Sequence, residues 1–196
     1  MPKLILASSS ERRLTLLKQI GYVPDVICVP NIDESIFKFE KPKDYSRRIA
    51  KDKAIKVARQ YPDEVLVSAD TVVCIGRRIL DKALTSEDAY NHLSLLSGRR
   101  HRVYTSVSVI YQSKILLKTA TSIVKFKRLT KEEIKYIIES RQWYGKSGGY
   151  ALQGIASAFI SWIRGSDTNI IGLPLHETYK MLNSLGVSPC SAKIRD

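Results

Sequence analysis

Hydroxyl and arginine side chains follow the first apolar stretch of the chain. Residues 4–7 (LILA) are followed by three serines, beginning with Ser8, and then by Arg12 and Arg13 at the start of a helical pattern. Cations in the first turn of a helix oppose the helix dipole by about 0.3–1 kcal/mol each. A bound anion would reverse this cost, because it would meet free backbone N–H groups, hydroxyls and guanidinium groups together. The pattern predicts a phosphate site, although Ser10 as a simple N-cap with solvated arginines remains the alternative.

Carboxylates occupy two further positions where chemistry is possible. Asp70 follows the apolar stretch 65–69, and Glu34 lies in the loop after residues 25–29. The carboxyl ends of strands line the ligand crevice in open α/β sheets, so Asp70 can hold a metal or activate water there. Glu34 can supply a second hard ligand beside Asp70. The alternatives are a turn aspartate and a solvated loop acid.

Lysines and a glycine-rich segment complete the candidates. Lys53, Lys82 and Lys146 are scattered along the chain, and lysine suits phosphate as a point charge, although each can equally be an ordinary surface residue. The segment 145–154 (GKSGGYALQG) contains glycines that allow close approach to a ligand. Gln153 within it offers both an acceptor and donors to the edge of a base. An ordinary flexible loop is the alternative.

The charge balance is strongly positive. The chain has 196 residues, with 32 Lys and Arg against 19 Asp and Glu, a formal net charge of +13. The excess is spread along the chain without a basic tail, which leaves a basic binding face or a cleft for a small polyanion. The run Arg99–Arg102 can indicate a nucleic-acid patch, but strand alternation places Arg102 and Tyr104 on one face and Val103 on the other. We see no aromatic-interleaved binding module, which disfavours a nucleic-acid partner.

Composition excludes several classes of protein. Hydrophobic residues make up 44% and charged residues 26%, which is enough to fill a core and excludes general disorder. No apolar run approaches the roughly 20 residues of a membrane-spanning helix, and the N-terminal apolar stretch is too short for a signal peptide. We therefore expect a cytoplasmic protein with no membrane partner. Cys28, Cys74 and Cys190 lack metal-ligand spacing and are expected to be free thiols.

The elements that must position these residues follow from periodicity and turn signals. Strands are predicted at 3–7, 25–29, 65–69, 102–111, 114–127 and 157–164, with a hairpin over 72–80. Helices are predicted after residue 10, from Pro42, from Thr85 or Ser86 to Leu96, from Thr130, and over 175–185. Because strands alternate with helices but hairpins intervene, the pattern indicates an α/β fold with a mixed sheet.

Five of these segments, taken in order, resemble motifs of the Maf family of nucleoside triphosphate pyrophosphatases. They are LILASSSERR, SADTVV, SGRRHRVYTS, GGYALQG and GSDTNIIGLPL, and the resemblance extends to about residue 187. It implies a single domain over 1–196, related to inosine triphosphate pyrophosphatases, with an elongated central sheet and two lobes around a deep cleft. It also implies a homodimer that hydrolyses a nucleoside triphosphate to the monophosphate and pyrophosphate with a divalent metal, Mg²⁺ or Mn²⁺.

The resemblance also assigns roles by position. Asp70 matches the catalytic carboxylate and proton acceptor, with Glu34 beside it at the metal. Groups around the phosphates are matched by Ser8, Arg13, Lys53 and Lys82. Three positions that set base preference are matched by Arg12, Thr71 and Gln153, and these residue types look like the subfamily acting on dTTP and UTP.

Three positions depart from the family pattern. Glu11 and Ala83 replace prolines, and Gly145 replaces an aspartate of the late loop. Alternatives to the dTTP/UTP assignment are the sister subfamily that prefers 7-methyl-GTP, a nucleic-acid-binding protein, and a regulator of cell division, since the family is associated with septum formation.

Overall fold

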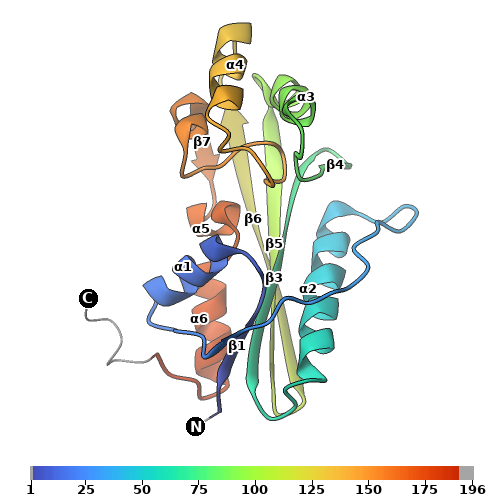
Figure 1. Ribbon diagram of the computed structural model, residues 1–196, viewed down its shortest axis with the longest axis vertical. Helices are drawn as coiled ribbons and strands as arrows, with labels where there is room; N and C mark the ends of the chain where they lie inside the picture. The colour runs from blue at the N-terminus through green and yellow to red at the C-terminus, as the bar shows by residue number, and fades with distance from the viewer. Residues whose placement is uncertain (1, 190–196) are drawn as a thin grey trace.

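A computed structural model describes residues 2–189 of the chain, so Cys190 lies outside the described residues (Figure 1). Its strands are β1 (Leu4–Ala7), β2 (Val26–Ile27), β3 (Val65–Ile75), β4 (Arg78–Leu80), β5 (Arg100–Tyr111), β6 (Lys114–Phe126) and β7 (Ile160–Arg164). Its helices are α1 (Glu11–Gln19), α2 (Pro42–Ala58), α3 (Ser86–Leu96), α4 (Lys131–Glu139), α5 (Asp167–Ile171) and α6 (Leu175–Ser184), with a 3₁₀ helix at Ile155–Phe159.

The strands form one seven-stranded sheet in the order β2-β1-β3-β5-β6-β7, with β4 on the edge of β3. β1 runs parallel to β2 and β3, and the other pairs are antiparallel, which confirms the mixed α/β fold. The long β5–β6 hairpin turns at Gln112 and Ser113, both with positive φ (47° and 64°). Such turns match the right-handed twist of the strands. The hairpin forms the spine of an elongated sheet.

The two faces of the sheet are covered unequally. Along β5, Val107 packs in a cluster with α1 and α6, and Val103 packs in a second cluster with α3 and α4. The opposite face carries α2, whose Ser46 hydroxyl lies 2.7 Å from that of Ser106. Figure 1 shows α2 on the other side of the sheet from α1 and α6. Because α2 covers only the lower half, helices cover one face along its length and the other only in part.

Most predicted elements are confirmed, but the end of the third strand is wrong. β3 runs through Asp70 to Ile75, because β5 pairs with it continuously from Leu66 to Cys74. A single polar residue in a fully paired ladder does not end the strand. The predicted strands 25–29 and 157–164 shorten to Val26–Ile27 and Ile160–Arg164, and the short helix α5 was not predicted.

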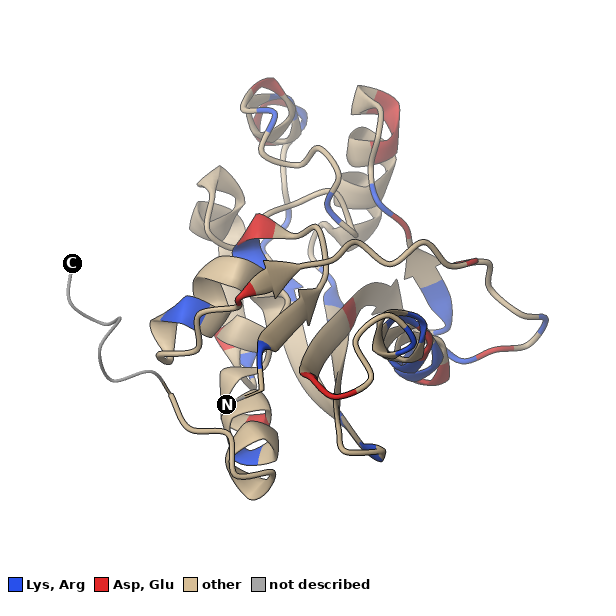
Figure 2. Cartoon of the chain, turned by 60° about the horizontal axis from the view of Figure 1, so that its bottom comes forward, with Lys and Arg blue, Asp and Glu red and all other residues tan. Residues whose placement is uncertain are grey.

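Charged residues do not gather in one segment. Lys and Arg occur on strands, helices and loops, and acidic residues are interspersed among them (Figure 2). The excess of positive charge therefore does not mark one element of the fold as a binding site.

Candidate active site

The candidate site lies at a gap on the edge of β3. β1 pairs with residues 65–68 of this strand and β4 with residues 73–75. Within the described part of the chain, residues 69–72 thus have no strand partner on this edge. Asp70 and Thr71 are neighbours and so point to opposite faces of the sheet. Both line one cavity of about 430 Å³, which therefore reaches around the open edge.

On the α2 side, one lysine joins two carboxylates. Lys53 Nζ lies 3.0 Å from Asp70 Oδ1 and 2.9 Å from Glu34 Oε1. Lys53 and Asp70 are only 8% and 7% exposed. Burial by itself would raise the pKa of Glu34, but its hydrogen bond to Lys53 and the charges of Lys53, Lys82 and Arg13 together lower that pKa. The two acids are held at the cavity wall by a cation from α2.

The loop that carries Glu34 is itself fixed to α2. Tyr45 donates its hydroxyl to the Glu34 carbonyl at 2.8 Å, and Arg48 donates to the Ser35 carbonyl at 2.9 Å. Arg48 also makes two hydrogen bonds of 2.7 Å to Glu40. Sequence reasoning missed both helical residues, whose only signal was their place on a polar stretch of a helix. The neighbouring acid, Asp33, accepts from the backbone N–H and the hydroxyl of Ser35, which makes it a turn residue.

On the opposite face, Arg13 is oriented by three acceptors. Its Nε donates to the Gly172 carbonyl at 2.9 Å, Nη1 to Ser8 Oγ at 3.0 Å and Nη2 to Thr71 Oγ1 at 3.2 Å. These bonds use three of its five N–H groups and leave two for a ligand. Burial lowers the pKa of Arg13, while the charges of Asp70 and Glu34 act to raise it. The guanidinium remains a cation because its ordinary pKa lies far above neutrality.

Ser8 is prepared to donate to an anion. Its oxygen accepts from Arg13 and, at 3.2 Å, from the Ser10 backbone N–H. Because both lone pairs are engaged, the hydroxyl proton is left for another acceptor. The serine predicted from the sequence as a phosphate ligand has the donor that a phosphate oxygen requires.

A buried hydrogen-bond chain supports Arg13 from behind. Thr105 donates to the Asn169 carbonyl at 2.7 Å, and Thr71 Oγ1 lies 3.0 Å from Thr105 Oγ1. A hydroxyl has one proton, so Thr71 must donate to Thr105 and accept from Arg13. The Asn169 side chain is fully buried and bonds to the Thr105 N–H, the Val103 carbonyl and Ser122. Sequence reasoning missed Thr105 and Asn169; an asparagine inside a short apolar run was the available signal.

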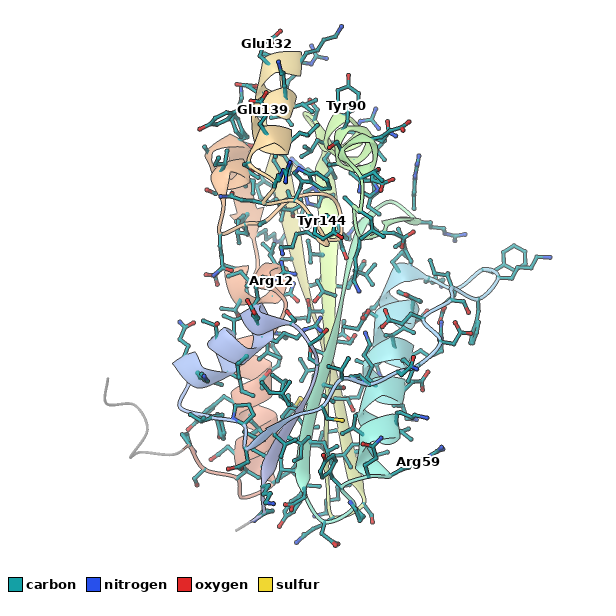
Figure 3. All side chains as sticks on the ribbon, in the orientation of Figure 1. Arg12, Arg59, Tyr90, Glu132, Glu139 and Tyr144 are labelled. Carbon is teal, nitrogen blue, oxygen red and sulfur yellow. The ribbon has the colours of Figure 1, made fainter. Side chains whose placement is uncertain are left out.

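The mouth of the cavity carries further cations. A backbone bridge joins Lys82 to Ser147, and the Ala83 N–H donates to the Lys146 carbonyl at 3.1 Å. Arg12 also lines the cavity, and Figure 3 labels it at the start of α1, below the loop that carries Tyr144. Burial, with a smaller contribution from Arg12, lowers the pKa of Lys146. The late loop thus brings a lysine toward the arginines of α1.

Gly145 adopts a backbone conformation that favours glycine. It has φ +65°, and a Cβ at this position would meet no atom within 4 Å. The departure from the family aspartate therefore leaves open space at the cavity wall, without a carboxylate.

The cavity brings together eight of the nine residues predicted from the sequence. They are Ser8, Arg12, Arg13, Glu34, Lys53, Asp70, Thr71 and Lys82. Gln153 is exposed and does not line the cavity, although its neighbour Leu152 does. The predicted contact of Gln153 with a base therefore stays a prediction.

The donor set suits a hard divalent cation. Asp70 and Glu34 each meet Lys53 through one oxygen, which leaves the second oxygen of each carboxylate available. Mg²⁺ is commonly held by one or two carboxylates together with substrate phosphates and water. No group of three or more His, Cys, Asp or Glu side chains suited to a metal occurs among residues 2–189. A metal here would therefore depend on the ligand's own oxygens.

Comparison with known proteins places the chain in a family. Residues 3–185 match the family model described as Maf-like protein, so the chain belongs to the Maf family. It is 54% identical over 181 residues to a nucleoside triphosphate pyrophosphatase of Ehrlichia canis (strain Jake), covering 92% of this chain and 94% of that protein. It is 52% identical over 183 residues to a dTTP/UTP pyrophosphatase of Wolbachia sp. subsp. Brugia malayi (strain TRS), covering 92% of both.

A solved structure shows a similar fold at low identity. The HAM1 protein from Coxiella burnetii matches with a TM-score of 0.54 and 12% identity, over 94% of this chain and 100% of that one. In the described part of the chain, no helix has the length and apolar character needed to cross a membrane.

Proposed function

We propose that this Maf protein is a nucleoside triphosphate pyrophosphatase that hydrolyses dTTP and UTP to the monophosphate and pyrophosphate. The names of its relatives support the reaction and the two nucleotides. The observation that carries the proposal is the cavity, where a carboxylate pair bridged by Lys53 faces Arg13 and Ser8 across one open strand edge. The carboxylate pair can act on water, and Arg13 and Ser8 can hold phosphates.

In the proposed reaction, a water oxygen bonds to the α-phosphorus as the bridging bond to the β-phosphate breaks. The electron pair of that bond leaves with pyrophosphate, and Asp70 accepts the proton of the water. Lys53 holds Asp70 in place at the cavity wall, with its Nζ 3.0 Å from Asp70 Oδ1. A divalent metal held by Asp70 and Glu34 would neutralise part of the phosphate charge.

The other cavity residues position the substrate. Arg13 offers two free N–H groups and Ser8 its hydroxyl proton, while Lys82 and Lys146 add positive charge at the mouth. Phosphoryl transfer depends mainly on such positioning and on charge neutralisation. Arg12, Thr71 and Gln153 are proposed to set base preference, of which the first two line the cavity.

The test is pyrophosphate release from a panel of canonical triphosphates and 7-methyl-GTP with Mg²⁺ or Mn²⁺. We expect dTTP and UTP to be the best substrates. Asp70→Asn should lower the rate by about 10²–10⁴-fold, the usual contribution of a general base. Asp33→Asn is the matched control, because the side chain of Asp33 accepts from Ser35 within its own turn and Asp33 does not line the cavity. Release from no nucleotide, or an Asp70→Asn variant near the wild-type rate, would contradict the proposal.

Two remaining predictions need their own measurements. We propose a homodimer, to be measured by analytical ultracentrifugation of the full chain, and a cytoplasmic location, to be measured by cell fractionation. A monomer at assay concentration, or recovery with membranes, would show the respective prediction to be wrong.

A further inference from the structure

The upper half of the α2 face of the sheet is uncovered and basic. Two cross-strand rows lie on it, since residues directly opposite in antiparallel strands share a face. One row is Arg100, Lys125 and Trp162, and the next is Arg102, Ile123 and Arg164. Tyr104 continues the same face along β5. We call these seven residues the basic sheet face.

The four cations of the basic sheet face have no acidic partner among residues 2–189. None of them forms an ion pair with an acid in the part of the chain that the structure describes. A hollow of about 600 Å³ adjoins Lys125 and adds Arg99, Lys127 and Arg128. Within the described residues, Lys127 alone of these three is paired, at 2.7 Å from Glu133. Unbalanced cations repel one another and attract an extended polyanion.

Aromatic side chains lie among these cations. The Arg100 guanidinium lies 5.4 Å from the centre of the Trp162 ring, and Trp162 is 36% exposed. Tyr104 is half-buried one row beyond Arg102. Proteins that bind single strands combine a basic track with aromatic rings on which bases stack.

We propose that the basic sheet face binds single-stranded nucleic acid. The sequence does not predict this partner, because the cations and aromatic rings of the face are brought together by the pairing of β5, β6 and β7. A second copy of the chain, docked face to face about a two-fold axis, would bring like charges together without acids to offset them. A duplex would use the cations but leave Trp162 and Tyr104 without unstacked bases. The face is separate from the candidate active site, since none of its seven residues lines that cavity.

The direct test uses the full chain with fluorescently labelled (dT)₂₀ and (rU)₂₀, measured by anisotropy from 50 to 200 mM salt. Single strands lose affinity with a log–log slope of about −0.7 per neutralised phosphate, so four contacts predict a slope of about −3. This corresponds to a roughly 50-fold loss of affinity over that range. A matched hairpin duplex should bind more weakly.

Two sets of variants locate the contact. Arg100→Gln with Arg102→Gln should reduce the slope by about 1.4, at about 0.7 for each contact. Lys114→Gln with Lys118→Gln removes the same charge from the exposed opposite end of the β5–β6 hairpin and should leave the slope unchanged. Trp162→Leu should weaken binding by about 5- to 160-fold per stacked base without changing the slope. All these variants should keep wild-type pyrophosphate release.

Intrinsic fluorescence gives an independent readout. The chain has two tryptophans, and the other, Trp143, is buried at 5% exposure. Oligonucleotide should quench the wild type and not Trp162→Phe, whereas UTP should neither compete nor quench.

Several results would overturn the inference. They are no binding at 50 mM salt, equal loss in both double variants, competition by UTP, or binding to anionic lipid vesicles without binding to oligonucleotide. None of these depends on whether the cavity hydrolyses triphosphates.

Discussion

The cations of the cavity and those of the basic sheet face differ in what surrounds them. In the cavity, Lys53 is 8% exposed and lies within 3.0 Å of two carboxylates, and Arg13 is held by three acceptors. On the sheet face, Arg102 and Arg164 are exposed and have no acidic partner among the described residues. The net charge of +13 thus combines two different kinds of positive group.

The difference predicts different energetics. A buried charge that loses its partner costs several kcal/mol, because water cannot replace that partner. An exposed cation contributes little to stability and acts mainly on the rate and strength of encounter with anions. Substitutions in the cavity should therefore alter folding and catalysis together, whereas those on the sheet face should alter only binding.

The largest effect is expected for Lys53→Met, which removes the cation shared by Asp70 and Glu34. We expect the free energy of unfolding to fall by about 3 kcal/mol, the lower end for a buried pair, since Glu34 is partly solvated. Pyrophosphate release should fall by about 100-fold or more, because Asp70 and Glu34 lose the cation that holds them at the cavity wall. Lys51→Met, on an exposed position of the same helix, is the control for urea unfolding and activity. A Lys53→Met enzyme within a few-fold of wild type would contradict the comparison.

A second prediction concerns His101, which lies between Arg100 and Arg102 in sequence but points to the opposite face. It is 2% exposed, pairs with the Tyr150 hydroxyl at 2.7 Å, and burial lowers its pKa to about 4. The unfolded chain therefore binds a proton at higher pH than the folded chain does. Stability should be lost as pH falls from about 6.5 to about 4, by about 3 kcal/mol.

The measurement is urea unfolding of the wild type and His101→Gln at pH 7 and pH 4. The glutamine keeps a polar partner for Tyr150 but does not titrate, so the variant should lose about 3 kcal/mol less stability than the wild type over this range. His176→Gln, at an exposed position on α6, should behave as the wild type does. Parallel pH profiles for all three proteins would show that His101 is not held neutral by the core.

Local signals allowed most of the fold to be predicted from the sequence. The helix starts predicted at Thr85 or Ser86, at Thr130 and at Pro42, and the turn at residues 112–113, depend on signals within a few residues and are confirmed. The continuation of β3 through Asp70 could not be predicted, because it depends on pairing with β5, some 35 residues later in the chain.

The candidate site divides in the same way. Ser8, Arg13 and Asp70 belong to contiguous motifs, so the sequence could indicate them. Thr105 and Asn169 bond to each other over 64 positions and reach the cavity only through Thr71. Residues that orient others through tertiary contacts leave no spacing for a pattern to detect.

The third prediction tests that hydrogen-bond chain. Thr105→Val keeps the shape of the side chain but leaves the Asn169 carbonyl without its hydroxyl donor, at a cost of about 1–3 kcal/mol in unfolding free energy. Thr71 also loses its acceptor, so Arg13 should be held less well and KM for UTP should rise more than kcat falls. Thr105→Ser retains the hydroxyl and should restore both. Equal KM values for the valine variant and wild type would mean that the hydrogen bonds of Thr105 have no role in positioning Arg13.

The smallest effect is expected for Arg48→Met, which loosens the loop of Glu34 without touching the cavity. Arg48 joins Glu40, the Ser35 carbonyl and, at 3.8 Å, the Phe37 ring. The partly exposed ion pair of Arg48 with Glu40 contributes about 1 kcal/mol, which corresponds to about fivefold if all of it appears in the rate. The effect is small because Glu34 keeps its bonds to Tyr45 and Lys53.

The loss from Arg48→Met should appear as a higher requirement for Mg²⁺ or Mn²⁺ in the pyrophosphate assay, since Glu34 is the proposed metal ligand on that loop. Arg59→Met, at the far end of α2, removes the same charge and should change nothing (Figure 3). If excess metal did not restore the rate, Arg48 would not act through metal binding at Glu34. A rise in metal requirement with a loss of only about 1 kcal/mol in stability would separate, within one helix, Arg48, which positions a metal ligand, from Lys53, which holds buried charge.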